Sequence, residues 1–181
     1  MKKILCLILC LVFVFSLTAC GKDSAKTEKH SVDVEYYAKL GQISELEYKL
    51  GGDIEDAKAL LHETLDDHGD PNFFEYESGE YTIMTDGGVC VCYKTDDKKA
   101  GITHIVKYGD AYGFISGDVS VQIRDTMTSL GYEATEKDAS KDTVFFMPVG
   151  ADMTTLEYKI KENTVLFIFQ EHALSATVIS K

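Results

Sequence analysis

Residues 156–170, LEYKIKENTVLFIFQ, indicate the architecture most clearly. Over Leu156 to Lys161, apolar residues alternate with charged ones, which predicts a strand with one buried and one solvated face. A second predicted strand, Val165 to Gln170, is apolar up to Phe169 and follows the turn residues Glu162-Asn163. Two strands joined by a short turn predict an antiparallel sheet whose apolar face packs against a helix.

Two amphipathic helices are expected upstream of the strands that they would cover. The first has Asp53 as its N-cap and apolar residues at helical spacing until Gly69, and the second has Asp118 as its cap and ends at Gly131. After the first helix, strands are expected at Phe73 to Tyr76, Tyr81 to Thr85, Val89 to Lys94 and Ile102 to Tyr108. After the second, they are expected at Tyr132 to Thr135, Thr143 to Met147, Leu156 to Lys161, Val165 to Gln170 and Ala176 to Ile179. We therefore predict an α+β fold of two similar units, residues 32–116 and 117–181, each a helix packed on an antiparallel β-meander.

A shift of 65 residues brings the two predicted units into register, with Tyr93-Lys94 on Tyr158-Lys159. The residue identities alone are close to chance, but the helix starts, helix ends and central strands coincide at one offset, so an internal duplication stays open. This order of elements resembles the tandem units of the beta-lactamase inhibitor proteins and the related small lipoproteins of outer-membrane assembly. The resemblance implies a fold of tandem helix-and-meander units and suggests inhibition of a hydrolase as one possible function.

The first 20 residues have the pattern of a secretory signal. Lys2 and Lys3 precede an apolar run from Ile4 to Phe15, and Leu17-Thr18-Ala19-Cys20 closes the segment. The apolar run is too short for a membrane-spanning helix. The ending resembles the lipobox of bacterial lipoproteins, which implies that residues 1–19 are removed and that Cys20 carries a diacylglycerol thioether.

The lipobox resemblance implies a protein held at the cell membrane by the lipid on Cys20 and facing outside the cytoplasm. Residues 20–31 comprise this cysteine and a polar stretch without apolar periodicity, which predicts a flexible tether. The folded part is expected to begin near Val32.

The mature chain would be strongly acidic. Lys2 and Lys3 leave with the signal, so 16 basic residues oppose 30 acidic ones, a formal charge of −14. Such a surface repels phosphate backbones and anionic headgroups. Nucleic acid is therefore an improbable partner, and attachment to the membrane must come from the lipid.

Two cysteines remain in the expected folded part, Cys90 and Cys92. Residues two apart on an extended strand have Cα atoms close to 7 Å apart, at the outer limit for a disulfide, which favours free thiols. Because Val91 and Tyr93 are expected to face the core, Cys90 and Cys92 should lie on the outer face of the sheet. There they could bind a soft metal together with His104, or they could pack under a second layer.

Catalytic signatures are missing from the sequence. It contains no nucleophile elbow, zinc-protease helix motif or phosphate-binding glycine loop. The histidines and acids from Leu61 to Asp70 lack the order of a calcium loop and indicate a solvated helix end.

We therefore predict a non-catalytic binding or interaction module with no cofactor, lipid-anchored at the bacterial cell surface, with an envelope protein as a possible partner. Capture of a small ligand or metal for uptake and inhibition of a hydrolase are the alternatives.

Overall fold

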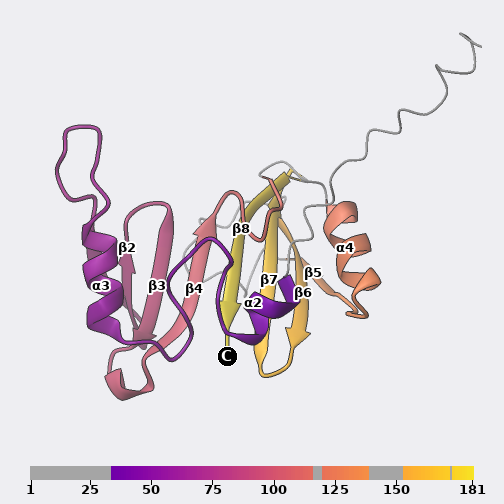
Figure 1. The fold of residues 1–181 in the computed structure, drawn as a ribbon, viewed down its shortest axis with the longest axis horizontal. Helices are drawn as coiled ribbons and strands as arrows, with labels where there is room; N and C mark the ends of the chain where they lie inside the picture. The colour runs from indigo at the N-terminus through magenta and orange to yellow at the C-terminus, as the bar shows by residue number, and fades with distance from the viewer. Residues whose placement is uncertain (1–33, 116–119, 139–152, 172) are drawn as a thin grey trace, which may run out of the picture. The chain divides into compact units, whose positions relative to one another are not determined.

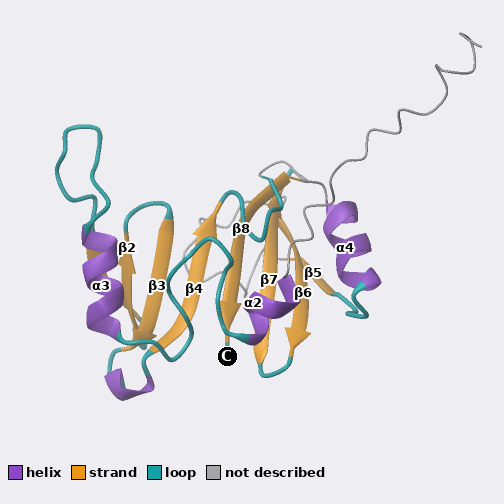
Figure 2. Cartoon of the chain, in the orientation of Figure 1, coloured by secondary structure: helices purple, strands orange, loops and turns teal. Residues whose placement is uncertain are grey.

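The computed structural model describes residues 34–115, 120–138, 153–171 and 173–181 (Figure 1). All of them belong to one compact unit, Val32–Lys181. The helices are α2 (Val34–Lys39), α3 (Ile54–His62) and α4 (Ser120–Ser129), with one 3-10 turn, η1 (Lys98–Ala100). The strands are β1 (Phe74–Ser78), β2 (Tyr81–Thr85), β3 (Val89–Lys94), β4 (Ile102–Tyr108), β5 (Thr135–Asp138), β6 (Met153–Ile160), β7 (Asn163–Gln170) and β8 (Ala173–Ser180) (Figure 2).

The strands form a single eight-stranded sheet in the order β1-β2-β3-β4-β8-β7-β6-β5. Every neighbouring pair is antiparallel. The two meanders meet where β4 pairs with β8, with Ile105 opposite Ile179 and Val106 opposite Val178. One sheet therefore runs from β1 to β5 without a break between the halves of the chain.

The predicted α+β fold of two similar units, each a helix packed on an antiparallel β-meander, is wrong, because the described residues make a β-rich fold around one continuous sheet. The alternation of apolar residues located β2, β3 and β4 correctly, but it carries no information about which strand edges pair. The β4–β8 ladder satisfies the backbone groups of two edges that would otherwise be open. The strand expected at Thr143 to Met147 lies outside the described residues.

Three helices pack on one face of the sheet, which we call the helix face. In Figure 1, α2 crosses in front of β6 and β7 and α3 lies beside β2, in agreement with the contacts between these elements. The main core lies between these helices and the sheet and includes Val91, Tyr93 and Phe167 from the strands. The predicted inward direction of Val91 and Tyr93 is thus confirmed.

The opposite sheet face, which we call the thiol face, carries a second apolar cluster. Its members are Ile83, Cys90, Cys92, Val106, Met153, Leu166, Ile168 and Ala176. Cys92 and Ile168 have no exposed surface at all. Both faces of the sheet centre therefore lack contact with solvent.

The hairpin of β6 and β7 confirms the alternation of buried and more exposed residues that the sequence predicts for Leu156 to Ile160. Leu156, Tyr158 and Ile160 are buried in the main core, while Lys159 is exposed. The turn is one residue earlier than expected, because Ile160 pairs with Asn163 and leaves Lys161 and Glu162 as the loop. Helix α2, which the sequence patterns did not indicate, packs on this region, and the side-chain amide of Asn163 donates to the Ala38 carbonyl at 2.7 Å.

Helix α3 begins as predicted and ends earlier. The Asp53 side chain accepts from the backbone N–H groups of Glu55 and Asp56 at 2.8 and 3.1 Å. The helix ends at His62, so the predicted continuation to Gly69 is wrong, and Leu65, an apolar residue within that predicted stretch, is 58% exposed. The chain turns away because the Asp66 carboxylate accepts from backbone N–H groups inside the following loop, which competes with continued helix.

Helix α4 buries Ile123 and Met127 as its spacing predicts. Its expected cap, Asp118, lies outside the described residues. Gly131, with φ of 87°, ends the helix as expected, and the N–H of Tyr132 donates to the Met127 carbonyl. Among the described residues, no helix is long and apolar enough to cross a membrane.

Replacing the N-cap Asp53 with alanine is expected to lower the free energy of unfolding by about 1 kcal/mol, because two backbone N–H groups at the start of α3 lose their acceptor. Urea unfolding followed by circular dichroism measures the change. Asp53→Asn keeps an acceptor oxygen and should stay within a few tenths of a kcal/mol. Equal losses in the two variants would contradict a capping role.

Candidate interaction surface

The residues predicted as metal ligands lie together on the thiol face. Cys92 and His104 are directly opposite each other across the β3–β4 ladder, and Cys90 is two residues from Cys92 on the same face. Both cysteines are free and buried. The predicted lipidation site, Cys20, lies outside the described residues.

The surroundings of these side chains favour packing over metal binding. Burial raises the pKa of the Cys92 thiol and lowers the pKa of the His104 imidazole. The Cys90 thiol lies 3.2 Å from the Thr85 hydroxyl and 3.7 Å from the Tyr108 hydroxyl. A metal needs the thiolate, which this setting disfavours, and no group of three metal-ligating side chains occurs among the described residues.

The two thiols are expected to resist alkylating and disulfide reagents in the native protein. In residues 20–181 with Cys20→Ser, reaction with a disulfide reagent should be at least about 100-fold slower than in urea, because both thiols are buried and burial raises the pKa of the Cys92 thiol. Raising the pH from 7 to 9 speeds the reaction of an ordinary exposed thiol with the reagent roughly tenfold or more. The reaction of the native protein should stay slow over the same pH range. Absorbance of the released thiolate measures both rates. A native rate equal to the unfolded one would show that the thiol face is open.

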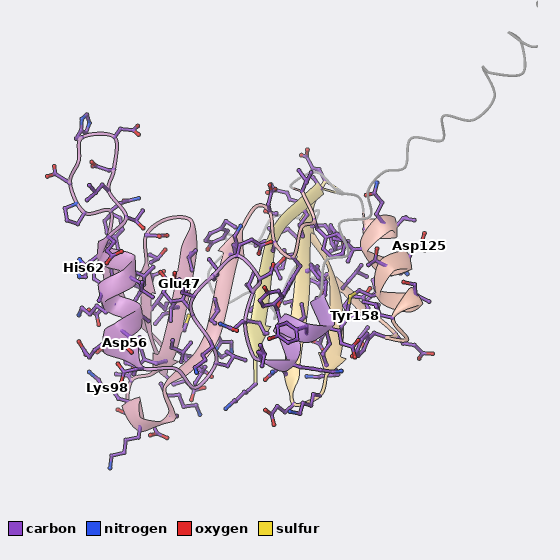
Figure 3. The ribbon with its side chains drawn as sticks, viewed as in Figure 1. Glu47, Asp56, His62, Lys98, Asp125 and Tyr158 are labelled. Carbon is purple, nitrogen blue, oxygen red and sulfur yellow. The ribbon has the colours of Figure 1, made fainter. Side chains whose placement is uncertain are left out.

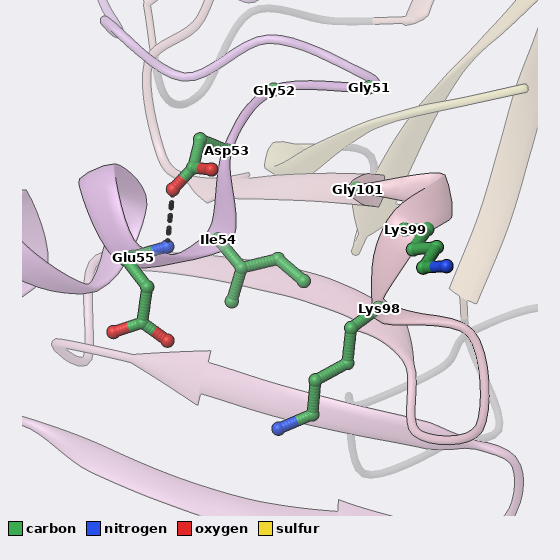
Figure 4. Close-up of a pocket in the computed structure, with 8 residues that line it drawn as sticks. All are labelled: Gly51, Gly52, Asp53, Ile54, Glu55, Lys98, Lys99 and Gly101. Atoms are coloured by element: carbon green, nitrogen blue, oxygen red, sulfur yellow. Dashed lines mark hydrogen bonds between the residues drawn. The ribbon is translucent and has the colours of Figure 1, made fainter.

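An open pocket of about 430 Å³ lies at the start of α3 (Figure 4). Gly51 to Glu55 form one side, and Lys98 and Lys99 of η1 contribute to the other. The carboxylate of Asp53 is turned onto the helix, and its hydrogen bond to the backbone of Glu55 is drawn in Figure 4. Because Asp53 already accepts from N–H groups at the helix start, the N-terminus of α3 offers little to an anion in this pocket.

Negative charge is concentrated on the part of the chain that contains α3, β1 and β2. Residues 53–86 contain eleven acidic residues and one basic residue, Lys58, a formal charge of −10 out of −12 for the whole chain. The loop between α3 and β1 contributes Glu63, Asp66, Asp67 and Asp70, all exposed. Figure 3 shows Asp56 near the start of α3 and His62 at the end of the helix, from which this loop leaves. We call this region, residues 53–86, the acidic surface.

Lys58 is already neutralised by a neighbour. It pairs with Glu75 of β1, and its hydrogen bond holds the pKa of the Glu75 carboxyl below the usual range. The Tyr93 hydroxyl also donates to Glu75, at 3.2 Å. No described cation lies within ion-pair distance of Glu77, two residues further along the same strand. The acidic surface therefore has an excess of unneutralised carboxylates.

Two large aromatic residues are exposed within the acidic surface. Phe74 is 60% exposed and Tyr76 is 46% exposed, although both belong to a β-strand. Tyr76 lies opposite Ile83, which places both aromatic side chains at the rim of the thiol face. Aromatic side chains exposed among charged ones are typical of protein contact sites. Composition could have indicated this region, because the charge run is visible in the sequence, but the exposure of Phe74 could not be read from it.

The described residues thus define a class of protein with one eight-stranded antiparallel sheet, helices on one face, and an acidic surface at one end of the sheet. Comparisons with protein-family models, curated proteins and solved structures give no match to this chain.

Proposed function

We propose that this chain is a bacterial lipoprotein, anchored outside the cytoplasm by lipid on Cys20, whose folded part is a non-catalytic module that binds a basic protein of the cell envelope. The observation that carries the proposal is the acidic surface with the exposed side chains of Phe74 and Tyr76. Clustered carboxylates attract a cationic partner and speed its association, and exposed aromatic rings supply apolar contact area. The lipobox and the polar tether that follows it support the proposed location at the membrane, outside the cytoplasm.

The anchor is tested on the full chain and on Cys20→Ser, expressed in a bacterial host. The unaltered chain should fractionate with membranes, and its N-terminal peptide should have the mass of a diacylglyceryl cysteine at position 20. Cys20→Ser should lose that mass and should not be processed at this position. An unmodified Cys20 in the unaltered chain would refute the proposed anchor.

Binding is tested with the mature chain carrying Cys20→Ser, coupled through its N-terminus and exposed to solubilised envelope from the source organism. A saturable partner should be retained at low salt and released as the ionic strength rises. Reversing the charge of Glu63, Asp67 and Asp70 to lysine should weaken binding at least tenfold. The matched control reverses Asp125, Glu133 and Glu162, which are equally exposed but outside the acidic surface.

Two results would overturn the proposed function. Retention of no saturable protein would remove the evidence for an interaction module. Equal weakening by the two triple variants would show that net charge alone acts, without a specific surface.

A further inference from the structure

Strand β1 is a free edge of the sheet. Among the strands that the structure describes, it is at the end of the order and pairs only with β2, in a register without a bulge from Phe74 opposite Thr85 to Ser78 opposite Tyr81. All five of its residues are exposed. An exposed edge strand presents unpaired N–H and C=O groups to which a further strand can bind.

The turn between β1 and β2 determines which backbone groups face outward. Ser78 pairs with Tyr81 around the two-residue loop Gly79-Glu80, and Gly79 has φ of 61°, as the first position of a type II′ turn requires. The pair that closes such a loop exchanges hydrogen bonds, and bonded pairs then alternate along the ladder. The N–H and C=O groups of Glu75 and Glu77 therefore point away from β2, along the free edge.

The two sides of this edge differ in chemistry. Glu75 bonds to Lys58 of α3 and to Tyr93, so the glutamates lie on the helix face. Phe74 and Tyr76 lie on the thiol face, where they are largely exposed. A strand added to this edge would place alternate side chains next to carboxylates and next to aromatic rings.

Natural edges are usually protected by a proline, a lysine or a bulge. Strand β1 contains no proline and no lysine, and its ladder has no register shift. Its glutamates disfavour pairing with another copy of the chain, because two acidic surfaces of charge −10 would be brought together. The same glutamates favour a strand with basic residues at the facing positions.

We propose that β1 binds an extended segment of a basic partner by strand addition, with Lys or Arg beside Glu77 and the rest of the acidic surface, alternating with apolar residues beside Phe74 and Tyr76. This proposal rests on the proposed function and specifies how its partner is held. The partner's backbone pairs with Glu75 and Glu77, and the alternation of its side chains selects the register.

The test uses the ¹⁵N-labelled mature chain with Cys20→Ser and the peptide TKVKVKVT at low salt. Saturating peptide should slow amide hydrogen exchange at Glu75 and Glu77 at least tenfold and leave exchange in β5, at the opposite edge, unchanged. The peptide TEVEVEVT, in which only the charge is reversed, should bind at least tenfold more weakly.

Two variants at one position separate backbone pairing from charge. Glu77→Pro removes an outward N–H without removing a bond to β2, so the hairpin should persist while peptide affinity falls at least tenfold. Glu77→Gln keeps the N–H, so it should lose affinity roughly threefold and retain the slowed exchange at Glu75.

Binding with unchanged exchange at Glu75 and Glu77, or no binding at millimolar peptide, would overturn strand addition. Envelope capture distinguishes this failure from failure of the proposed function. Equal capture of the envelope partner by the unaltered chain and by Glu77→Pro would refute strand addition at β1 but leave the proposed interaction module standing. No capture by the unaltered chain would refute the interaction module itself.

Discussion

Phe167→Ala is expected to lower the free energy of unfolding by about 3–5 kcal/mol, the usual cost of removing a fully buried phenylalanine. Phe167 has no exposed surface and lies at the centre of the main core. Its ring meets those of Tyr112, Phe114 and Tyr158 edge to face, at centroid distances of 6.3, 5.6 and 6.0 Å. The variant loses all three contacts and leaves a cavity. Urea unfolding followed by circular dichroism is the appropriate measurement because the chain has no tryptophan.

Phe74→Ala is the matched control for this loss. The same atoms are removed, but from a side chain that is 60% exposed, so the change should stay within about 0.5 kcal/mol. A loss below about 1.5 kcal/mol for Phe167→Ala, or equal losses for the two variants, would contradict a core centred on β7. Phe74→Ala should also lower the affinity of the basic peptide, which separates its role in binding from any role in stability.

Gly101→Ala is expected to cost roughly 3 kcal/mol or more, because steric overlap adds to backbone strain. Gly101 has φ of 69° and ψ of −157°, a region that only glycine occupies readily. A Cβ atom there would lie 2.6 Å from the Gly52 carbonyl oxygen and 2.9 Å from the carbonyl of Gly51. The close approach of Gly101 to Gly51 and Gly52 places the segment before α3 against β4. In the same region, the Gly51 N–H donates to the Ile102 carbonyl at 2.7 Å.

Gly69→Ala separates strain from steric overlap. Gly69 also has a positive φ, 84°, but nothing lies within 4 Å of the added Cβ, so the cost should be only about 1 kcal/mol. Chemical unfolding of both variants gives the comparison. Equal costs would mean that the close approach of Gly101 to Gly52 does not matter for stability.

Most individual strands could be predicted, because each is specified by its own residues, but the strand expected at Tyr132 to Thr135 overlaps β5 (Thr135–Asp138) only at Thr135. Burial of Tyr93 and Tyr158 follows from alternation along a single strand and holds in any sheet. Helix α2 was not predicted because its six residues are too few for a periodic pattern, and its stability depends on tertiary contacts such as its packing against β6 and β7. The end of α3 was misplaced because the side chain of Asp66 forms turn bonds that an apolar pattern does not show.

The candidate site could be predicted only in part. The position of Cys90 and Cys92 on the face opposite the core follows from strand alternation, and their neighbour His104 was anticipated on the next strand. The sequence does not decide whether these thiols are buried, because that depends on what covers the thiol face. The free edge of β1 was not anticipated, since whether a strand lies at an edge depends on where every other strand pairs.

The sequence by itself determined the local properties: which segments are strands, which side of each is apolar, where α3 begins, and how acidic the chain is. Tertiary structure alone decided that β4 pairs with β8 and that β1 is left at the end of the sheet. The physical reason is that backbone hydrogen bonds are the same for every residue type, so strand order depends on the joint packing of distant segments. The proposed interaction surface depends on both sequence and tertiary structure. Its negative charge comes from the acidic residues of 53–86, and its free edge exists only once the sheet is assembled.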